Sequence, residues 1–224
     1  MALTLFDLDN TLLTGDSDHA WMEFLGSRGI VDAEEFNHRN DQFYADYVAG
    51  RLDIHAFLDF QLTPLAAHPR AQLDVWHRDY LQERVLPMIS NRARALVEDH
   101  RQQGDVLVII TATNRFVTAP IATEFGIENL LATEPEVNTD GEFTGKTVGT
   151  PCFQAGKIER LRHWLQEQQL DWQQSLQGST FYSDSYNDLP LLETVDHPVA
   201  VNPDERLRTH ATSKGWPILS LHDQ

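Results

Sequence analysis

The amino-acid sequence predicts an α/β protein built on a doubly wound parallel sheet. Several short segments are apolar throughout, as strands covered on both faces usually are, and patterns of helical spacing lie between them. Each apolar segment is followed directly by a polar residue. Because ligands of such sheets bind outside the carboxyl ends of the strands, we expect these polar residues to face one crevice.

Four segments have the character of buried strands, and three helical patterns separate them. The strand segments are 2–6, 106–110, 180–183 and 199–201, followed by Asp7, Thr111, Asp184 and Asn202. The helical patterns cover 92–103, 116–125 and 157–169, and a glycine closes each of the first two. A further segment, 134–146, contains Asp140 and Gly141, which predict the turn of a β-hairpin.

Residues 16–88 interrupt this alternation of strands and helices. They contain no convincing strand, and amphipathic helical patterns cover 21–28, 33–48, 54–62 and 71–85. Asp32 followed by Glu35 has the spacing of a capping box. We therefore expect a helical cap at 16–88, inserted into a catalytic core that consists of 1–15 and 89–224.

The charge of the chain restricts its partners. A formal net charge of −17, from 34 acidic and 17 basic residues, disfavours nucleic acid and anionic membrane surfaces. An anionic substrate would therefore need a metal ion or local basic groups beside it. The first residues lack both a basic start and a long apolar stretch, so we expect a cytoplasmic protein. Composition does not indicate an oligomeric state.

Cys152 is the single cysteine of the chain. It has no partner for an internal disulfide, and a lone cysteine is usually inert packing. A thiol nucleophile is the alternative.

Asp7 and Asp9 form the first candidate site. Two carboxylates two residues apart repel one another unless a cation or a proton lies between them, and Mg²⁺ prefers such oxygen ligands. Asp7, Asp184 and the carbonyl of Asp9 could bind this ion. The second oxygen of Asp7 could then attack phosphorus, and Asp9 could act as general acid and base. The alternative is that both acids only cap a turn.

Thr111, Lys157 and Asp188 extend this site to the other strand ends. The hydroxyl and backbone N–H of Thr111 could bind phosphate at the start of a helix, although such a threonine often only caps the helix. Lys157 opens a helix, where its charge opposes the helix dipole unless an anion lies nearby; the alternative is a solvated surface lysine. Asp188 could hold metal-bound water or orient Lys157, or simply favour a helix N-terminus.

The order and spacing of these residues resemble the four motifs of the haloacid dehalogenase superfamily. The segment 7–12 (DLDNTL), Thr111, Lys157 and the segment 184–188 (DSYND) match the motifs in sequence order. The resemblance implies that Asp7 is the nucleophile and Asp9 the general acid and base. It implies that Thr111, Ala112 and Lys157 bind phosphate. The Mg²⁺ site that it implies consists of Asp7, Asp9, Asp184 and Asp188.

The resemblance also limits the class of reaction that we expect. The namesake dehalogenases lack a second acid at the position of Asp9, so phosphoester hydrolysis of a small phosphorylated metabolite is favoured. The position of the helical cap, between the first two motifs, is similar to that in the phosphoserine phosphatase-like branch. In that branch an acidic residue nine positions after the nucleophile binds the substrate amine. Asp16 occupies that position. The Gly-Gly pair after the second motif is Ala112-Thr113 here, a departure from phosphoserine phosphatase itself.

The segment 14–21 is similar to a bacterial group that includes histidinol-phosphate phosphatases. We expect Asp16, His19 and Asn187 to determine specificity, and Asp18 and Glu23 to add negative charge near the cap. His19 and Trp21 could stack on an imidazole; a surface histidine and a core tryptophan are the alternatives. L-histidinol phosphate is the first substrate hypothesis and O-phosphoserine the second. A phosphomutase and a non-catalytic ligand-binding protein are the competing functions.

Overall fold

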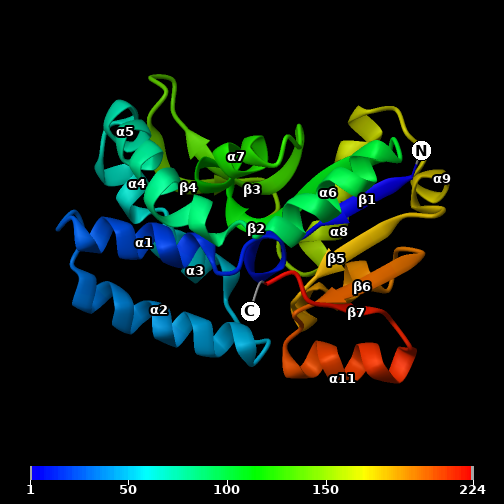
Figure 1. The fold of residues 1–224 in the computed structure, drawn as a ribbon. Coiled ribbons are helices and arrows are strands. Elements are labelled where there is room, and N and C mark those ends of the chain that lie inside the picture. The colour runs from blue at the N-terminus through cyan, green and yellow to red at the C-terminus, as the bar shows by residue number, and fades with distance from the viewer. Residues whose placement is uncertain (1, 223–224) are drawn as a thin grey trace.

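A seven-stranded sheet with the strand order β4-β3-β2-β1-β5-β6-β7 forms the centre of the protein (Figure 1). This computed structural model describes residues 2–222. All neighbouring strands are parallel except β3 and β4. The strands are β1 Leu3–Phe6, β2 Val106–Asn114, β3 Asn129–Val137, β4 Phe143–Val148, β5 Thr180–Ser183, β6 His197–Val201 and β7 Ile218–Leu219. The predicted α/β class is confirmed.

The apolar segments predicted as strands are all strands, but two of them are longer than predicted, and β6 begins at His197, two residues before the predicted segment. β2 continues past Thr111 to Asn114, with a register shift against β3, and the Thr133 hydroxyl of β3 donates to the Ala112 carbonyl at 2.7 Å. The predicted hairpin is confirmed as β3 and β4. The parallel part of β3 and the short strand β7 were not predicted, because neither has a long apolar run.

Helices cover both faces of the sheet. One face packs against α6 (Asn91–Gln102) and α7 (Arg115–Glu124), and the other against α8 (Ala155–Glu167), α10 (Leu189–Leu192) and α11 (Glu205–Lys214). The short helix α9 (Trp172–Leu176) precedes β5. Successive residues of β1 enter different cores: Leu5 packs with the α8 side and Phe6 with the α6 side. Burial on both faces explains why these strands are continuously apolar.

Helices also fill the segment between β1 and β2, as predicted. They are α1 Ser17–Ser27, α2 Ala33–Val48, α3 Ile54–Gln61, α4 Thr63–Ala67 and α5 Arg70–Tyr80, followed by a π-helical turn at Leu81–Val85 and a 3-10 turn at Leu86–Met88. Aspartates cap three of these helices: the side chains of Asp16, Asp32 and Asp53 accept backbone N–H groups in the first turns. None of the described helices is long and apolar enough to span a membrane.

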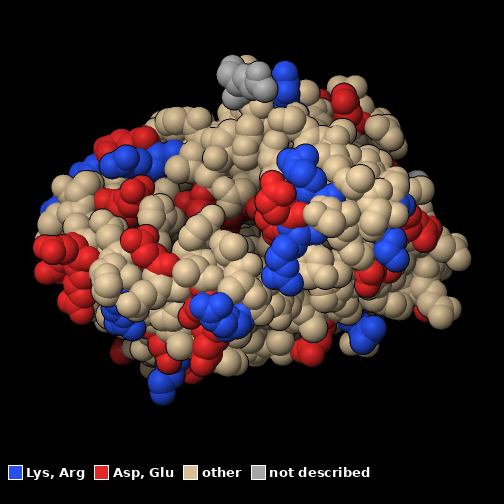
Figure 2. Space-filling view, turned by 90° about the horizontal axis from the view of Figure 1, so that it is seen from below, with Lys and Arg blue, Asp and Glu red and all other residues tan. Residues whose placement is uncertain are grey.

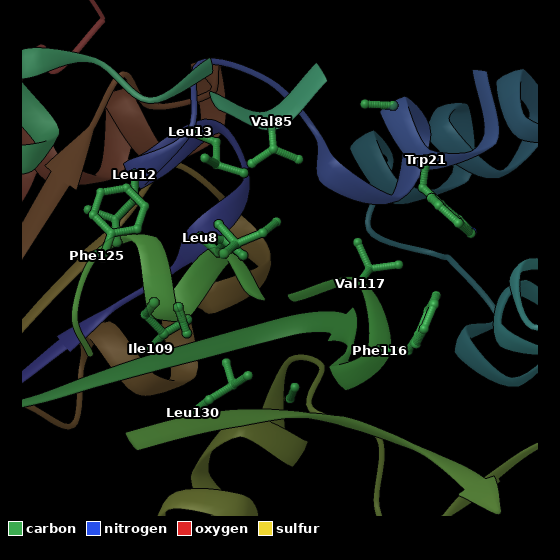
Figure 3. Close-up of a cluster of buried hydrophobic side chains, with 14 of the residues drawn as sticks. Leu8, Leu12, Leu13, Trp21, Val85, Ile109, Phe116, Val117, Phe125 and Leu130 are labelled. Atoms are coloured by element: carbon green, nitrogen blue, oxygen red, sulfur yellow. The ribbon is translucent and has the colours of Figure 1, made fainter. Parts of the chain in front are cut away.

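Trp21 joins these helices to the sheet. Its ring is 1% exposed and packs edge-on against Tyr80 and Phe116, with ring centroids 5.1 and 5.7 Å apart. Figure 3 shows Trp21 and Phe116 near Val117, in the cluster that also contains Leu8 and Ile109 of the sheet side. The hypothesis that Trp21 stacks on a substrate is therefore wrong, because its ring is enclosed in the hydrophobic core.

Candidate active site

The ends of three neighbouring strands define the site. Asp7 follows β1 directly, Thr111 lies in β2 and Asp184 follows β5, and these strands are adjacent in the order β2-β1-β5. Because all three are parallel, their carboxyl ends meet at one edge. The structure thus brings together three of the four predicted strand ends. Neither Asp184 nor Asn202 lines the cavity described below, but the Thr11 hydroxyl links Asp184 to Asp7.

The turn after β1 places two carboxylates in a common cavity. A π-helical turn at Leu8–Leu12 is broken at Asp9, which is extended, and at Asn10, which has a φ of 56°. Asparagine tolerates this left-handed conformation better than most residues. Asp7 and Asp9 both line the cavity, and the Asp7 side chain makes no capping hydrogen bond. A simple capped turn therefore does not explain Asp7.

Lys157 is buried between two carboxylates. Its Nζ donates to Asp7 Oδ1 and to Asp188 Oδ2, both at 2.7 Å, and the residue is only 2% exposed. Burial alone would lower the pKa of Lys157, but the charges of Asp188 and Asp7 hold it above its usual value. The alternative of a solvated surface lysine is wrong. Ser183 also donates to Asp188 Oδ2, at 2.7 Å.

Asp7 and Asp184 share a single hydrogen-bond donor. The Thr11 hydroxyl lies 3.2 Å from both Asp7 Oδ2 and Asp184 Oδ1, and it has one hydrogen to donate. Burial raises the pKa of Asp7 to about 6, and burial followed by the Asp7 and Asp188 charges raises that of Asp184 well above its usual value. Because burial is the main cause of both shifts, a cation that entered between the two carboxyl groups would stabilise their charged forms.

These oxygens fit a magnesium ion. Two carboxylates and the Asp9 carbonyl are hard donors, and Mg²⁺ commonly takes one or two carboxylates with water and substrate phosphate completing its shell. Among residues 2–222, no three His, Cys, Asp or Glu side chains gather around one point. A magnesium site here would accordingly depend on backbone and non-protein oxygens as well as on Asp7 and Asp184.

Asp9 has hydrogen-bond donors on both carboxylate oxygens. Ser17 N donates to Oδ1 at 2.7 Å and the Thr113 hydroxyl to Oδ2 at 2.8 Å. Burial, and then the charge of Asp16, raises the pKa of Asp9 to about 6. A carboxyl group that titrates near neutral pH can both release and accept a proton there.

Thr111 and Ala112 line the same cavity. The Thr111 hydroxyl accepts the backbone N–H of Thr113 at 3.2 Å. The expected helix start at Thr111 is wrong, because β2 continues and Asn114 caps α7 by accepting Val117 N. The N-terminus of α7 at Arg115 therefore lies four residues beyond Thr111 and close to the start of the predicted helical pattern of 116–125.

The cavity has a volume of about 400 Å³, within the usual range for small-molecule sites. Helices α2 and α3 contribute an aromatic and aliphatic wall, including Phe43, Tyr44 and Phe57. Six carboxylates line it: Asp7, Asp9, Asp16, Asp18, Asp41 and Asp188. Among the described residues that line it, Lys157 is the only lysine or arginine. Figure 2 shows acidic side chains in and around a recess on this face of the molecule.

Two of the three predicted specificity residues line the cavity, and the third does not. Asp16 and His19 line the cavity, and the Asn40 amide contacts His19 Nδ1 at 2.6 Å. Asn187 does not line the cavity. Its amide donates to the Tyr47 carbonyl at 3.1 Å and its side-chain oxygen accepts from Gln154, also at 3.1 Å.

Tyr47 connects α2 to the loop after β5. Its hydroxyl donates to Ser185 Oγ at 2.8 Å, close to the Asn187 contact. We expect Tyr47→Phe to lower the free energy of unfolding by about 1 kcal/mol, because it removes one partly buried hydrogen bond. Ser185→Ala should lower it by about 2 kcal/mol, because Ser185 Oγ also accepts the backbone N–H of Asn187. Urea unfolding of both variants and of the double variant would measure the coupling. Fully additive losses would contradict a direct interaction.

Cys152 is not a candidate nucleophile. It is fully buried, and burial raises the pKa of its thiol to about 12. Its backbone N–H donates to Thr133 Oγ1 at 3.1 Å, which places it in the packing beneath β3. The interpretation of Cys152 as inert packing is supported.

Comparison with known proteins assigns the family. A family model described as haloacid dehalogenase-like hydrolase matches residues 4–193. The chain belongs to this family. The match spans the turn at Asp7 and Asp9, the Lys157 helix and the loop that carries Asp184 and Asp188. This haloacid dehalogenase-like hydrolase is a phosphoric monoester hydrolase.

Two curated relatives align with nearly the whole length of the hydrolase. It is 48% identical over 219 residues to a histidinol-phosphatase of Neisseria meningitidis serogroup C (strain 8013), covering 98% of both chains. It is 33% identical over 227 residues to the phosphoserine phosphatase SerB1 of Mycobacterium tuberculosis (strain ATCC 25618 / H37Rv), covering 97% of this chain and 70% of that one.

Solved structures confirm the fold of this hydrolase. A protein of unknown function from Bordetella pertussis Tohama I has a TM-score of 0.91, with 42% identity and 99% of both chains covered. A phospho-aspartyl intermediate analogue of phosphoserine phosphatase has a TM-score of 0.70 at 17% identity, with 100% of this chain and 94% of that chain covered. The second likeness concerns the fold alone.

Several residues of the site were not predicted from the sequence. Thr11 and Thr113 lie next to predicted residues in the chain, and their hydroxyls bond to Asp7 and Asp9. Their proximity to the motifs was the available signal. Ser183, which bonds to Asp188, also lies next to a predicted residue. Asn40 and Tyr47 have no such signal, because their contacts join segments that are apart in the sequence.

Proposed function

We propose that this hydrolase is a Mg²⁺-dependent phosphatase of L-histidinol phosphate that acts through an aspartyl phosphate on Asp7. The helices of 16–88 serve as the cap over a core of 1–15 and 89–224. The composition of the cavity is the observation that supports this substrate. The cavity is lined by six carboxylates, by one lysine that is already paired with carboxylates, and by an aromatic wall. Such a cavity favours a phosphate ester that also carries positive charge and a planar ring.

Asp7 is the nucleophile in this proposal. One carboxylate oxygen of Asp7 attacks phosphorus while the bond between phosphorus and the alcohol oxygen breaks, and Asp9 gives its proton to that leaving oxygen. Asp9, now a carboxylate, takes a proton from water. The water oxygen attacks the phosphorus of the aspartyl phosphate, the bond to Asp7 breaks, and inorganic phosphate leaves.

Lys157, Thr111 and Ala112 bind the phosphoryl oxygens. The Lys157 ammonium already lies 2.7 Å from the nucleophile, so it can offset charge that develops on the transferring group. Asp188 holds Lys157 in this position through its own 2.7 Å contact. Mg²⁺, held by Asp7, Asp184 and the Asp9 carbonyl, would supply further neutralisation of the phosphate charge.

The charges of the cavity favour histidinol phosphate over O-phosphoserine. Both substrates carry a phosphate and an ammonium group, but phosphoserine also carries a carboxylate. The single cationic side chain among the described lining residues, Lys157, is paired with Asp7 and Asp188. A substrate carboxylate would consequently enter an acidic cavity without a partner, which costs free energy. The 48% identical histidinol-phosphatase supports the same choice.

A panel of phosphate monoesters tests this proposal. Purified protein with Mg²⁺ should release inorganic phosphate from L-histidinol phosphate with a higher kcat/KM than from O-phosphoserine, sugar phosphates or nucleotides. Faster release from phosphoserine would favour the second substrate hypothesis. Transfer of the phosphoryl group to a second metabolite, without release of phosphate, would indicate a phosphomutase.

Removal of divalent metal should lower turnover at least about 100-fold, because the buried charges of Asp7 and Asp184 would then repel the substrate phosphate. Addition of Mg²⁺ should restore activity. It should also raise the melting temperature of the substrate-free protein, because an ion that binds only the folded state stabilises it. Full activity after exhaustive chelation would contradict the metal site.

A further inference from the structure

Asp18 is a buried carboxylate of the cavity wall that the chemistry above does not use. It is 4% exposed, lies in the first turn of α1 and lines the cavity. Its Oδ1 accepts one hydrogen bond, from Asn114 Nδ2 at 3.2 Å. No cationic side chain of residues 2–222 forms an ion pair with it.

The surroundings of Asp18 increase its need for a positive partner. Burial, and then the charges of Asp16 and Asp9, raises the pKa of Asp18 well above its usual value. The nearby Thr113 hydroxyl donates its one hydrogen to Asp9 Oδ2 at 2.8 Å. A carboxylate in this position is therefore stabilised most by a cation that enters the cavity.

Asp16 is in a different situation, although the family resemblance points to it as the amine reader. Its Oδ1 accepts the backbone N–H of His19 at 2.9 Å and caps α1. It is more exposed than Asp18, so water already solvates part of its charge. Removing Asp16 should thus affect the helix first, whereas Asp18 has no comparable structural task beyond the contact to Asn114.

We propose that Asp18 is the specificity-determining residue that binds the ammonium group of the substrate. The inference rests on the proposed function in one respect, namely that the substrate phosphate lies at Asp7 in the same cavity. The ammonium group would donate to the Asp18 carboxylate, exchanging the repulsion among Asp9, Asp16 and Asp18 for a charge-assisted hydrogen bond. The chemical class of substrate is a phosphate ester of an alcohol that carries a primary amine.

Paired substrates that differ only in the amine test this inference. The first pair is L-histidinol phosphate and its analogue with hydrogen in place of the amine, and the second is O-phosphoethanolamine and ethyl phosphate. The wild-type protein should prefer the amine in each pair by about 10- to 100-fold in kcat/KM, the usual range for a buried hydrogen bond between charged groups. Equal use of both members of both pairs would overturn the inference.

The variant Asp18→Asn is nearly isosteric and keeps an oxygen that can accept from Asn114. It should reduce the ratio of kcat/KM between the amine substrate and its analogue to about threefold or less. The change should come from a lower kcat/KM for the amine substrate, with that of the analogue unchanged. Asp99→Asn, at an exposed carboxylate of α6 outside the cavity, is the matched control for loss of one charge. Asp16→Asn is the second comparison. Both should keep a preference within about threefold of wild type.

The outcomes separate the two proposals. If Asp18→Asn retains the wild-type preference, or Asp16→Asn abolishes it to the same degree, the role of Asp18 is wrong even when histidinol phosphate is the best substrate. If the second pair shows the Asp18-dependent preference while histidinol phosphate is a poor substrate, the amine site stands and the proposed substrate is wrong. Should Asp18→Asn fail to fold, calorimetry of wild-type protein with histidinol and its des-amino analogue decides, because equal affinities would overturn the inference.

Discussion

Replacing Asp7 by Asn should reduce phosphate release by at least about 10⁴-fold, because the amide that replaces the carboxylate is not a nucleophile toward phosphorus. The fold should persist, since Asn has nearly the shape of Asp and removes charge from a site where burial has raised the pKa of the carboxyl to about 6. The measurement is steady-state phosphate release together with mass spectrometry of acid-quenched protein. Wild type should show the mass of one added phosphoryl group, and the variant none.

The matched control for this experiment is Asp99→Asn, which removes one charge from the exposed face of α6. It should retain wild-type phosphate release. Retained turnover in Asp7→Asn, or a phosphorylated peptide that lacks residue 7, would contradict the covalent mechanism. Cys152 could not substitute as nucleophile, because its thiol is buried and has a pKa of about 12.

The strand ends were predictable because their physical signals are local. An apolar run that ends in a polar residue identifies both the strand and its tip, as at Asp7 after β1 and Asp184 after β5. Parallel neighbours then bring the tips together without further information. For Lys157 the sequence predicted a nearby anion, since a cation at a helix N-terminus is otherwise unfavourable, but it left a solvated surface lysine open; its burial was seen only in the structure.

The partners of these residues were not predictable because they depend on tertiary geometry. The Thr11 hydroxyl contacts Asp184, 173 residues away in the sequence, and it lies in the turn after β1 that is broken at Asp9 and Asn10. For Trp21 the sequence left two readings open, a ring that stacks on the substrate and a core tryptophan, and Asn187 was expected to determine specificity. The aromatic ring is enclosed by the core, and the Asn187 amide bonds to Tyr47 and Gln154.

The extent of β2 depends on a contact outside its own sequence. Thr111 follows a strongly apolar run, and its β-branched side chain is equally compatible with a strand end or a strand interior. Thr133 of β3 decides between them, because its hydroxyl bonds to the Ala112 carbonyl and its backbone pairs with Asn114. The cavity-facing backbone at Thr111 and Ala112 is therefore strand and not helix.

Lys157→Met should impair both catalysis and folding. We expect kcat/KM to fall by about 100- to 1,000-fold, because a buried cation beside the transferring group is lost. We expect the free energy of unfolding at pH 8 to fall by about 3–5 kcal/mol, since the change leaves the Asp7 and Asp188 carboxylates buried without their shared cation. Urea unfolding in the presence of a chelator measures the second effect.

The pH dependence of that loss distinguishes charge from packing. Without Lys157, the folded-state pKa of Asp7 should lie even further above its unfolded value of 3.8, because the cation that lowers it is gone. A raised carboxyl pKa costs stability at pH values above the folded pKa, and this cost disappears as the pH falls toward the unfolded pKa. The difference between wild type and Lys157→Met should thus shrink as the pH falls from 8 toward 5. A difference that stays constant would mean that Lys157 stabilises the fold through packing of its aliphatic chain, and the ion-pair account of the site would be wrong.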